Sequence, residues 1–166
     1  MSFMMLNENN QSDIEIVVWD EKYSTGIHLI DTQHKQLIDI TNQLYARCLK
    51  KDDVLEAAFK DTMSHMVEYV KFHFNAELKM LRAVNFPDFH NHKKQHDSMI
   101  QNILAAAKEY NEGKKFVPNN FVRTLRDWIL SHIAVYDKAY GFYIFEQIKN
   151  GTMTEKDLKE IEKSAV

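Results

Sequence analysis

Apolar residues recur every three or four positions along most of the chain, which is the spacing that places them on one face of an α-helix. The first such run predicts a helix that has Asp31 as its N-cap and ends near residues 51–53. The second run extends from Phe59 to Leu81 and ends before Pro87, because proline interrupts helical hydrogen bonding.

Two more helices follow the same pattern. The third begins near Asp88 and ends before Gly113, which we expect directly after the C-cap, where a positive φ favours glycine. The fourth opens at Pro118, a residue suited to the first helical turn, and runs through Tyr136 and Tyr140 on its apolar face. Four long amphipathic helices with short connections predict an all-α fold, an antiparallel up-down four-helix bundle.

The two ends of the chain predict smaller elements around this bundle. Residues 1–30 are expected to form a partly extended N-terminal arm that lies against the body of the protein. Thr154 and Asp157 have the spacing of a capping box, and they predict a short C-terminal helix within residues 152–166. We therefore expect one domain, with the bundle at residues 31–151 between the arm and the short helix.

The composition narrows the class of protein. Only four glycines and two prolines leave few positions for sharp turns, which argues against a β-sandwich or barrel. The single cysteine, Cys48, excludes an intrachain disulfide. Without a stretch apolar enough for a membrane span or a recognisable secretory signal, we expect a cytoplasmic protein. A net charge of −3 without a basic block indicates neither nucleic acid nor a membrane as a partner.

Each predicted helix also carries titratable side chains on its otherwise apolar face. They are His34 on the first helix, His73 and Glu77 on the second, His92 and His96 on the third, and His132 and Asp137 on the fourth. One buried histidine alone is more often a hydrogen-bonded core residue than a ligand. All seven together, without lysine or arginine on the same faces, favour bound cations over ordinary core polar groups. Seven donors exceed what one transition metal takes, so the count predicts two metals bridged by the two carboxylates.

The ligand types leave the identity of the metal open. Imidazole and carboxylate suit zinc, copper, nickel and iron. A closed structural zinc site usually contains cysteine, but Cys48 lies more than three helical turns from His34, so this alternative is disfavoured. The histidine-rich set with i, i+4 pairs also differs from the carboxylate-rich Glu-x-x-His pattern of ferritin-like diiron proteins.

With these residues in this order, the chain resembles the hemerythrin family, and within it the single-domain bacteriohemerythrins. The resemblance extends over most of the chain and rests on five motifs: Trp19–Gly26, Asp31–His34, His73–Glu77, His92–His96 and His132–Asp137. It implies two iron ions joined by an oxo or hydroxo bridge. It further implies that one iron with an open position is bound by His34 and His73, that the other is bound by His92, His96 and His132, and that both are bridged by Glu77 and Asp137.

From the resemblance we expect reversible binding of dioxygen by a carrier, store or sensor rather than an enzyme. Dioxygen is the expected partner, and the sequence identifies no protein partner. Apolar neighbours of the ligands are expected to line a dry ligand pocket: Leu37, Phe74, Trp128, Ile129 and Ile133. The alternatives are a diiron enzyme that acts on peroxide, nitric oxide or dioxygen, a store for another metal, and an oxygen or redox sensory module that acts in trans.

The last ligand pair has an unusual spacing. His132 and Asp137 are five residues apart, which on a regular α-helix rotates one side chain about 140° from the other. Either the two metals are far enough apart for both side chains to reach them, or the helix widens into a π-bulge. We predict a distortion of the helix between Ile133 and Gly141. The remaining histidines are expected to be structural or exposed: His28, His65 and His90.

Overall fold

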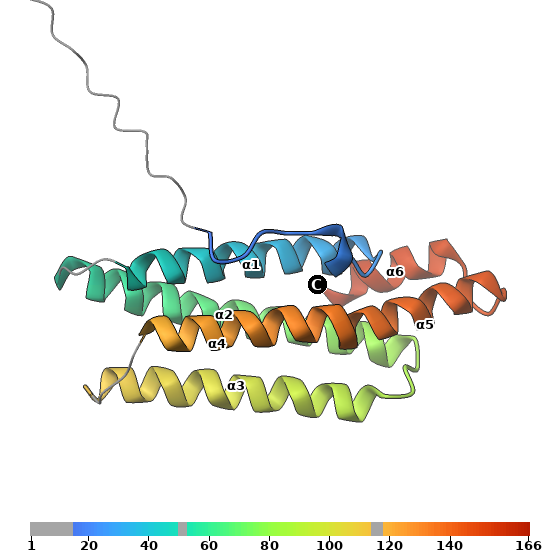
Figure 1. The fold of residues 1–166 in the computed structure, drawn as a ribbon. Coiled ribbons are helices and arrows are strands. Elements are labelled where there is room, and N and C mark those ends of the chain that lie inside the picture. Colours follow the sequence, from blue (N-terminus) through green and yellow to red (C-terminus); the bar gives the residue numbers. More distant parts are fainter. Residues whose placement is uncertain (1–14, 50–52, 114–117) are drawn as a thin grey trace, which may run out of the picture.

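The computed structural model of the protein describes residues 15–49, 53–113 and 118–166. Within these ranges every regular element is a helix (Figure 1). The long elements are α1 (His28–Cys48), α2 (Asp53–Ala83), α3 (Phe89–Asn111) and a continuous rod of α4 (Pro118–His132), the π-helical turn η2 (Ile133–Asp137) and α5 (Lys138–Lys149). The short elements are the 3-10 turn η1 (Glu21–Tyr23) and α6 (Glu155–Ala165). Successive rods alternate in direction, which confirms the predicted antiparallel four-helix bundle.

Most helix ends follow local signals in the sequence. α4 begins at Pro118 as predicted, and Gly113 follows the C-cap of α3 with a φ of +65°. Thr154 and Asp157 form the predicted capping box at the start of α6. The Asp157 amide donates to the Thr154 hydroxyl, and the Thr154 amide donates to the Asp157 carboxylate.

The start of α1 differs from the prediction. The helix begins at His28, so Asp31 lies inside its first turn and is not the N-cap. The Asp31 carboxylate instead accepts hydrogen bonds from the amide and the hydroxyl of Thr25, because the chain before the helix folds back over that turn. α1 ends at Cys48, earlier than the predicted 51–53, and of these positions 51 and 52 lie outside the described residues.

The described part of the N-terminal arm lies against the bundle, as predicted. The amides of Ile16 and Val17 donate to Asn42 Oδ1 on α1, and Asn42 Nδ2 donates back to the Val17 carbonyl oxygen at 2.8 Å. Further along the arm, Thr25 comes so close to α5 that a Cβ added at Gly141 would lie 2.6 Å from the Thr25 carbonyl oxygen. Glycine at position 141 therefore permits the contact between the arm and the rod.

Buried apolar residues form two clusters along the bundle. The larger one contains residues of α1, α2, α3, α4 and η2, and includes Phe74 and Ile133. The smaller one contains residues of α1, α2, α5 and α6, and includes Ala76 and Tyr140. Phe74 of the larger cluster directly follows His73, and Ala76 of the smaller cluster directly precedes Glu77, so the predicted ligands of α2 lie where the two clusters meet. In the described ranges no helix has the length and apolar character that a membrane span requires.

Candidate metal centre

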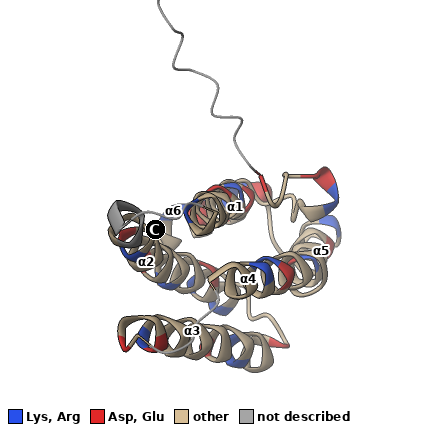
Figure 2. Ribbon diagram, turned by 60° about the vertical axis from the view of Figure 1, so that its left-hand side comes forward, with Lys and Arg blue, Asp and Glu red and all other residues tan. Residues whose placement is uncertain are grey.

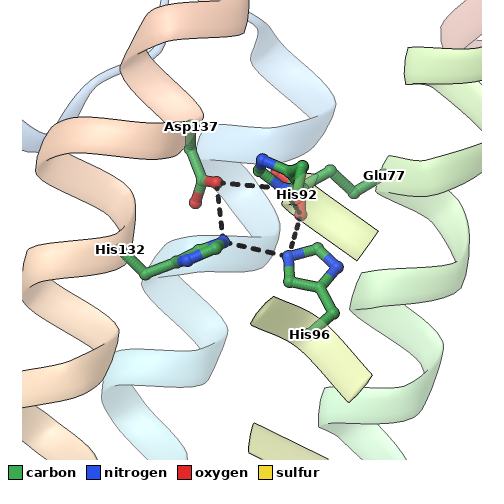
Figure 3. Close-up of side chains that lie close together, drawn as sticks. All are labelled: Glu77, His92, His96, His132 and Asp137. Atoms are coloured by element: carbon green, nitrogen blue, oxygen red, sulfur yellow. Dashed lines mark hydrogen bonds and ion pairs between the residues drawn. The ribbon is translucent and has the colours of Figure 1, made fainter. Parts of the chain in front are cut away.

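The seven side chains predicted as ligands come together in the interior of the bundle, and each is at most 3% exposed. Their donor atoms form two groups, and within each group all atoms lie within 4.8 Å of one another. The first group is Glu77, His92, His96, His132 and Asp137, and the second is His34, His73 and Glu77. Figure 3 shows the first group, in which side chains from three rods point toward one another. Because Glu77 belongs to both groups, its carboxylate lies between them.

A π-helical turn brings both donors of the last rod inward. η2 spans Ile133–Asp137, which confirms the predicted distortion. The additional residue in this turn aligns Asp137 with His132, whose Nε2 lies 3.1 Å from Asp137 Oδ1. The same turn places Tyr136 outward with 39% of its surface exposed. The prediction that Tyr136 continues the apolar face is therefore wrong, because Asp137 takes the inward position.

The Glu77 carboxylate contacts histidines from two helices. Its Oε2 lies 3.2 Å from His96 Nε2 and 3.6 Å from His92 Nε2, both on α3. The same oxygen lies 3.9 Å from His73 Nε2, one turn earlier on α2. A carboxylate with imidazoles of both groups within this range is placed to bridge two cations.

The Asp137 carboxylate spans the two groups in the same way, with one oxygen toward each. Its Oδ1 lies near His132 and 3.5 Å from His92 Nε2. Its Oδ2 lies 3.2 Å from Nε2 of His34 on α1. Both carboxylates thus lie between imidazoles that come from different helices, which is the arrangement expected of two bridging ligands.

Several polar atoms in this cluster have no hydrogen-bond partner within the described protein. They are both ring nitrogens of His34, Nε2 of His92, Nδ1 of His96, Oε2 of Glu77 and both carboxylate oxygens of Asp137. Each unsatisfied buried group costs about 1–3 kcal/mol, and a charged one costs more. Lysine and arginine are interspersed with acidic residues along the helices (Figure 2), and none is among the buried residues of the described ranges. The donor set therefore fits bound cations, for which imidazole and carboxylate are suitable ligands.

Burial and mutual contacts set the protonation states of these groups. Burial lowers the pKa of His73 to about 3, so its imidazole is neutral at pH 7. Burial alone raises the pKa of Glu77, but the imidazoles of His92 and His96 beside its carboxylate outweigh this effect and hold the pKa well below its usual value. Neutral imidazole and ionised carboxylate are the forms that bind metals.

Three residues beside the ligands escaped the sequence-based prediction. His73 Nδ1 lies 3.0 Å from Gln33 Oε1, and His132 Nδ1 lies 3.2 Å from Gln95 Oε1. The hydroxyl of the fully buried Tyr140 donates to Glu77 Oε1. Partners of this kind select the tautomer and orientation of metal-binding groups. One feature of the sequence could have pointed to the two glutamines: Gln33 directly precedes His34, and Gln95 directly precedes His96.

The residues predicted to line a ligand pocket lie in the apolar surroundings of the cluster. Four of them are buried in the larger apolar cluster: Leu37, Phe74, Ile129 and Ile133. The fifth, Trp128, is partly buried and packs against the same cluster. Phe74 also stacks on the His96 ring with a centroid separation of 3.7 Å. The three histidines outside the cluster are exposed: His28, His65 and His90.

The comparison with known protein families identifies the chain. The family described as "Hemerythrin HHE cation binding domain" matches residues 25–141, a range that contains all seven clustered side chains. The chain belongs to the hemerythrin family. Among its relatives, a bacteriohemerythrin of Methylococcus capsulatus is 27% identical over 120 residues, covering 72% of this chain and 89% of the relative. A bacteriohemerythrin of Clostridium acetobutylicum is 29% identical over 126 residues, covering 74% of this chain and 97% of the relative.

Solved structures of hemerythrins have the same fold as this hemerythrin-family chain. A crystal structure of a wild-type hemerythrin superposes with a TM-score of 0.71 at 26% identity, covering 76% of this chain and 95% of the other. In this family member, α6 lies beyond the matched residues 25–141, and it packs on the smaller apolar cluster through Leu158 and Ala165. The bundle and its buried cluster are thus the part that the family comparison covers.

Proposed function

We propose that this chain reversibly binds dioxygen at a carboxylate-bridged diiron centre. The observation that carries the proposal is the set of seven buried donors, several without hydrogen-bond partners, inside the region that matches the hemerythrin family. In this proposal Glu77 and Asp137 bridge the two ions. One ion is bound by His92, His96 and His132, and the other by His34 and His73.

The two donor groups differ in size, which supports different roles for the two ions. The first donor group has five members and the second has three. The second ion, beside His34 and His73, would therefore keep a position open for an external ligand. When bound there, iron would supply the electrons that hold dioxygen and take them back when it leaves. The residues of the chain then have the tasks of binding, orienting and shielding the two ions.

Shielding is the role that we assign to the apolar residues. Leu37 lies about one turn after His34 on α1, Phe74 directly follows His73 on α2, and both are buried. Ile129 and Ile133 flank His132 on the last rod and are also buried, with Trp128 beside them. A pocket with this lining excludes water and supplies no proton, which slows the irreversible loss of electrons to a bound oxygen molecule.

Orientation is the role that we assign to the polar partners of the ligands. Gln33 and Gln95 each face the Nδ1 atom of a ligand histidine, which leaves Nε2 of that ring for the metal. Tyr140 holds one oxygen of Glu77 and leaves the other directed toward the imidazoles. These contacts support a preorganised site that needs little rearrangement when the ions bind.

Metal analysis combined with spectroscopy tests the proposal. Protein loaded with iron should contain two iron ions per chain and show absorption of a bridged diiron site that changes reversibly between air and vacuum. His34→Ala should abolish the reversible change, whereas His28→Ala, a change at an exposed histidine, should preserve it. One zinc ion per chain, or a spectrum that never recovers under vacuum, would overturn the proposal. Turnover of peroxide or nitric oxide that Glu77→Ala abolishes would assign an enzyme instead.

A further inference from the structure

Three aromatic rings are stacked in a row along the last rod, with His132 in the middle. The Trp128 ring stacks on the His132 ring with a centroid separation of 4.5 Å and an interplanar angle of 13°. The Tyr136 ring stacks on His132 with a separation of 5.4 Å and an angle of 28°. His132 is among the candidate metal ligands, so the row connects the metal centre with two further rings.

The row reaches the surface of the protein. Tyr136 is 39% exposed, and its neighbour Val135 is 60% exposed. Other close ring contacts of the candidate ligands end inside the protein: Phe74, which stacks on His96, is 3% exposed, and Tyr140, which packs against His92, is fully buried. Within the described residues, His132 is thus the candidate ligand that has a stacked partner at the surface.

The exposed position of Tyr136 results from the same turn that completes the metal site. η2 places Asp137 inward and Tyr136 outward, while Tyr136 keeps its contact with His132. A regular helix would place one or the other at the inward position, because its turn is shorter by about one residue. The π-helical turn therefore supplies a bridging ligand and an exposed ring in contact with a second ligand at once.

We propose that the stacked contact from Tyr136 to His132 is the route by which electrons from an external one-electron donor reach the metal centre, with Trp128 as the ring beyond the ligand. The proposal rests on the diiron centre of the proposed function. A donor in contact with Tyr136 is oxidised by one electron, and one ferric ion bound through His132 becomes ferrous. No bond forms or breaks in the protein, and a second donor molecule reduces the second ion in the same way. Protein that has lost electrons to dioxygen is thereby returned to its ferrous state.

The contact of Tyr136 with His132 leads electrons to the ion of the larger donor group, which in the proposed function is not the ion that binds dioxygen. His132 belongs to the donor group of five, whereas the proposed function assigns the open position to the ion beside His34 and His73. A donor at Tyr136 thus approaches the ion that has no vacant position for dioxygen. The stacked rings of Tyr136 and His132 provide direct contact between the surface and the candidate ligand.

A photosensitiser at the surface tests the route without iron. In a Cys48→Ser, Trp19→Phe background, in which Trp128 is the one remaining tryptophan, Val135→Cys carries a ruthenium polypyridyl complex, which a laser flash and a soluble quencher oxidise. The metal-free protein should then form a Trp128 radical, detected by transient absorption, and Tyr136→Leu should abolish it. A Trp128 signal that Tyr136→Leu leaves unchanged would overturn the route.

A second label on the other donor group provides the matched control. Phe72 is 48% exposed and directly precedes the candidate ligand His73, but its ring contacts Tyr69, with a centroid separation of 6.0 Å. In ferric protein, photoreduction should be faster from Val135→Cys than from Phe72→Cys, and Tyr136→Leu should remove this difference. Equal rates from the two labels would overturn the route. Protein that binds no iron would contradict the proposed function instead, while the metal-free radical experiment would still test the row of rings.

Discussion

Tyr140→Phe removes a single hydroxyl from the core, and we expect it to weaken both the metal-free fold and the binding of metal. Tyr140 is fully buried, and its hydroxyl donates to Glu77 Oε1. Burial, followed by the nearby Glu77 carboxylate, raises the pKa of Tyr140 well above its usual value, so the phenol remains a donor. Removing a hydrogen bond to a buried carboxylate costs about 1.5–3 kcal/mol.

The size of this effect is measurable in two assays. For a chain of this length each kcal/mol shifts the unfolding midpoint by about 2–4 °C, so calorimetry of the metal-free variant should show a decrease of about 3–12 °C. Loss of the partner of a metal ligand typically costs about 10–100-fold in metal affinity. Competition with a chelator of known affinity should show a loss of iron affinity in that range.

Tyr143→Phe is the matched control, because it makes the same change one turn away on α5. The Tyr143 hydroxyl donates to the backbone carbonyl oxygens of Val84 and Asn85 at 3.2 and 3.3 Å, not to a carboxylate. This substitution should cost about 0.5–1.5 kcal/mol, the usual range for a neutral hydrogen bond, and leave iron affinity unchanged. Unchanged iron affinity in Tyr140→Phe, or an equal loss of affinity in Tyr143→Phe, would contradict a role of the Tyr140 hydroxyl in metal binding.

Three further predictions concern single residues. Metal-free protein should lose stability between about pH 7 and about pH 5, and His73→Asn should lose less. Burial lowers the pKa of His73 to about 3 in the folded protein, so below the ordinary pKa of histidine the unfolded chain takes up a proton that the folded protein does not, and unfolding is favoured. Urea titrations at both pH values would contradict this if the wild-type protein and His73→Asn lost equal stability. Cys48 should react with iodoacetamide at least about tenfold more slowly in the folded protein than in urea at about pH 8, because burial raises its pKa to about 12; equal rates would oppose this. Glu162→Ala should cost about 0.5–2 kcal/mol in thermal unfolding, because its carboxylate accepts a 2.9 Å hydrogen bond from the Leu29 amide at the start of α1. Glu160→Ala, an exposed change on the same helix, should cost less than about 0.5 kcal/mol, and a similar cost for both would argue against the cap.

The local periodicity of the sequence determined the helices and the residues on their inner faces. Apolar spacing, Pro118, Gly113 and the capping box at Thr154 act within a few residues, so they specify helix ends without knowledge of the rest of the fold. The five-residue spacing of His132 and Asp137 likewise predicted the irregular turn, because a regular helix would rotate the two side chains about 140° apart. Ligand candidates could be recognised because a polar residue on an apolar face is conspicuous in the sequence.

The contacts between groups on different helices follow from the tertiary structure and not from the sequence pattern. Tyr140 fits an apolar stripe as well as any aromatic residue, and its contact with Glu77 depends on how α5 packs against α2. Gln33 and Gln95 have ordinary sequence surroundings, and their roles follow from the histidines that other helices bring to them. Asp31 resembled an N-cap, but the loop that folds back through Thr25 uses its carboxylate differently. The physical reason is common to all of these: a hydrogen bond between elements depends on their relative placement, which hydrophobic periodicity along one helix does not encode.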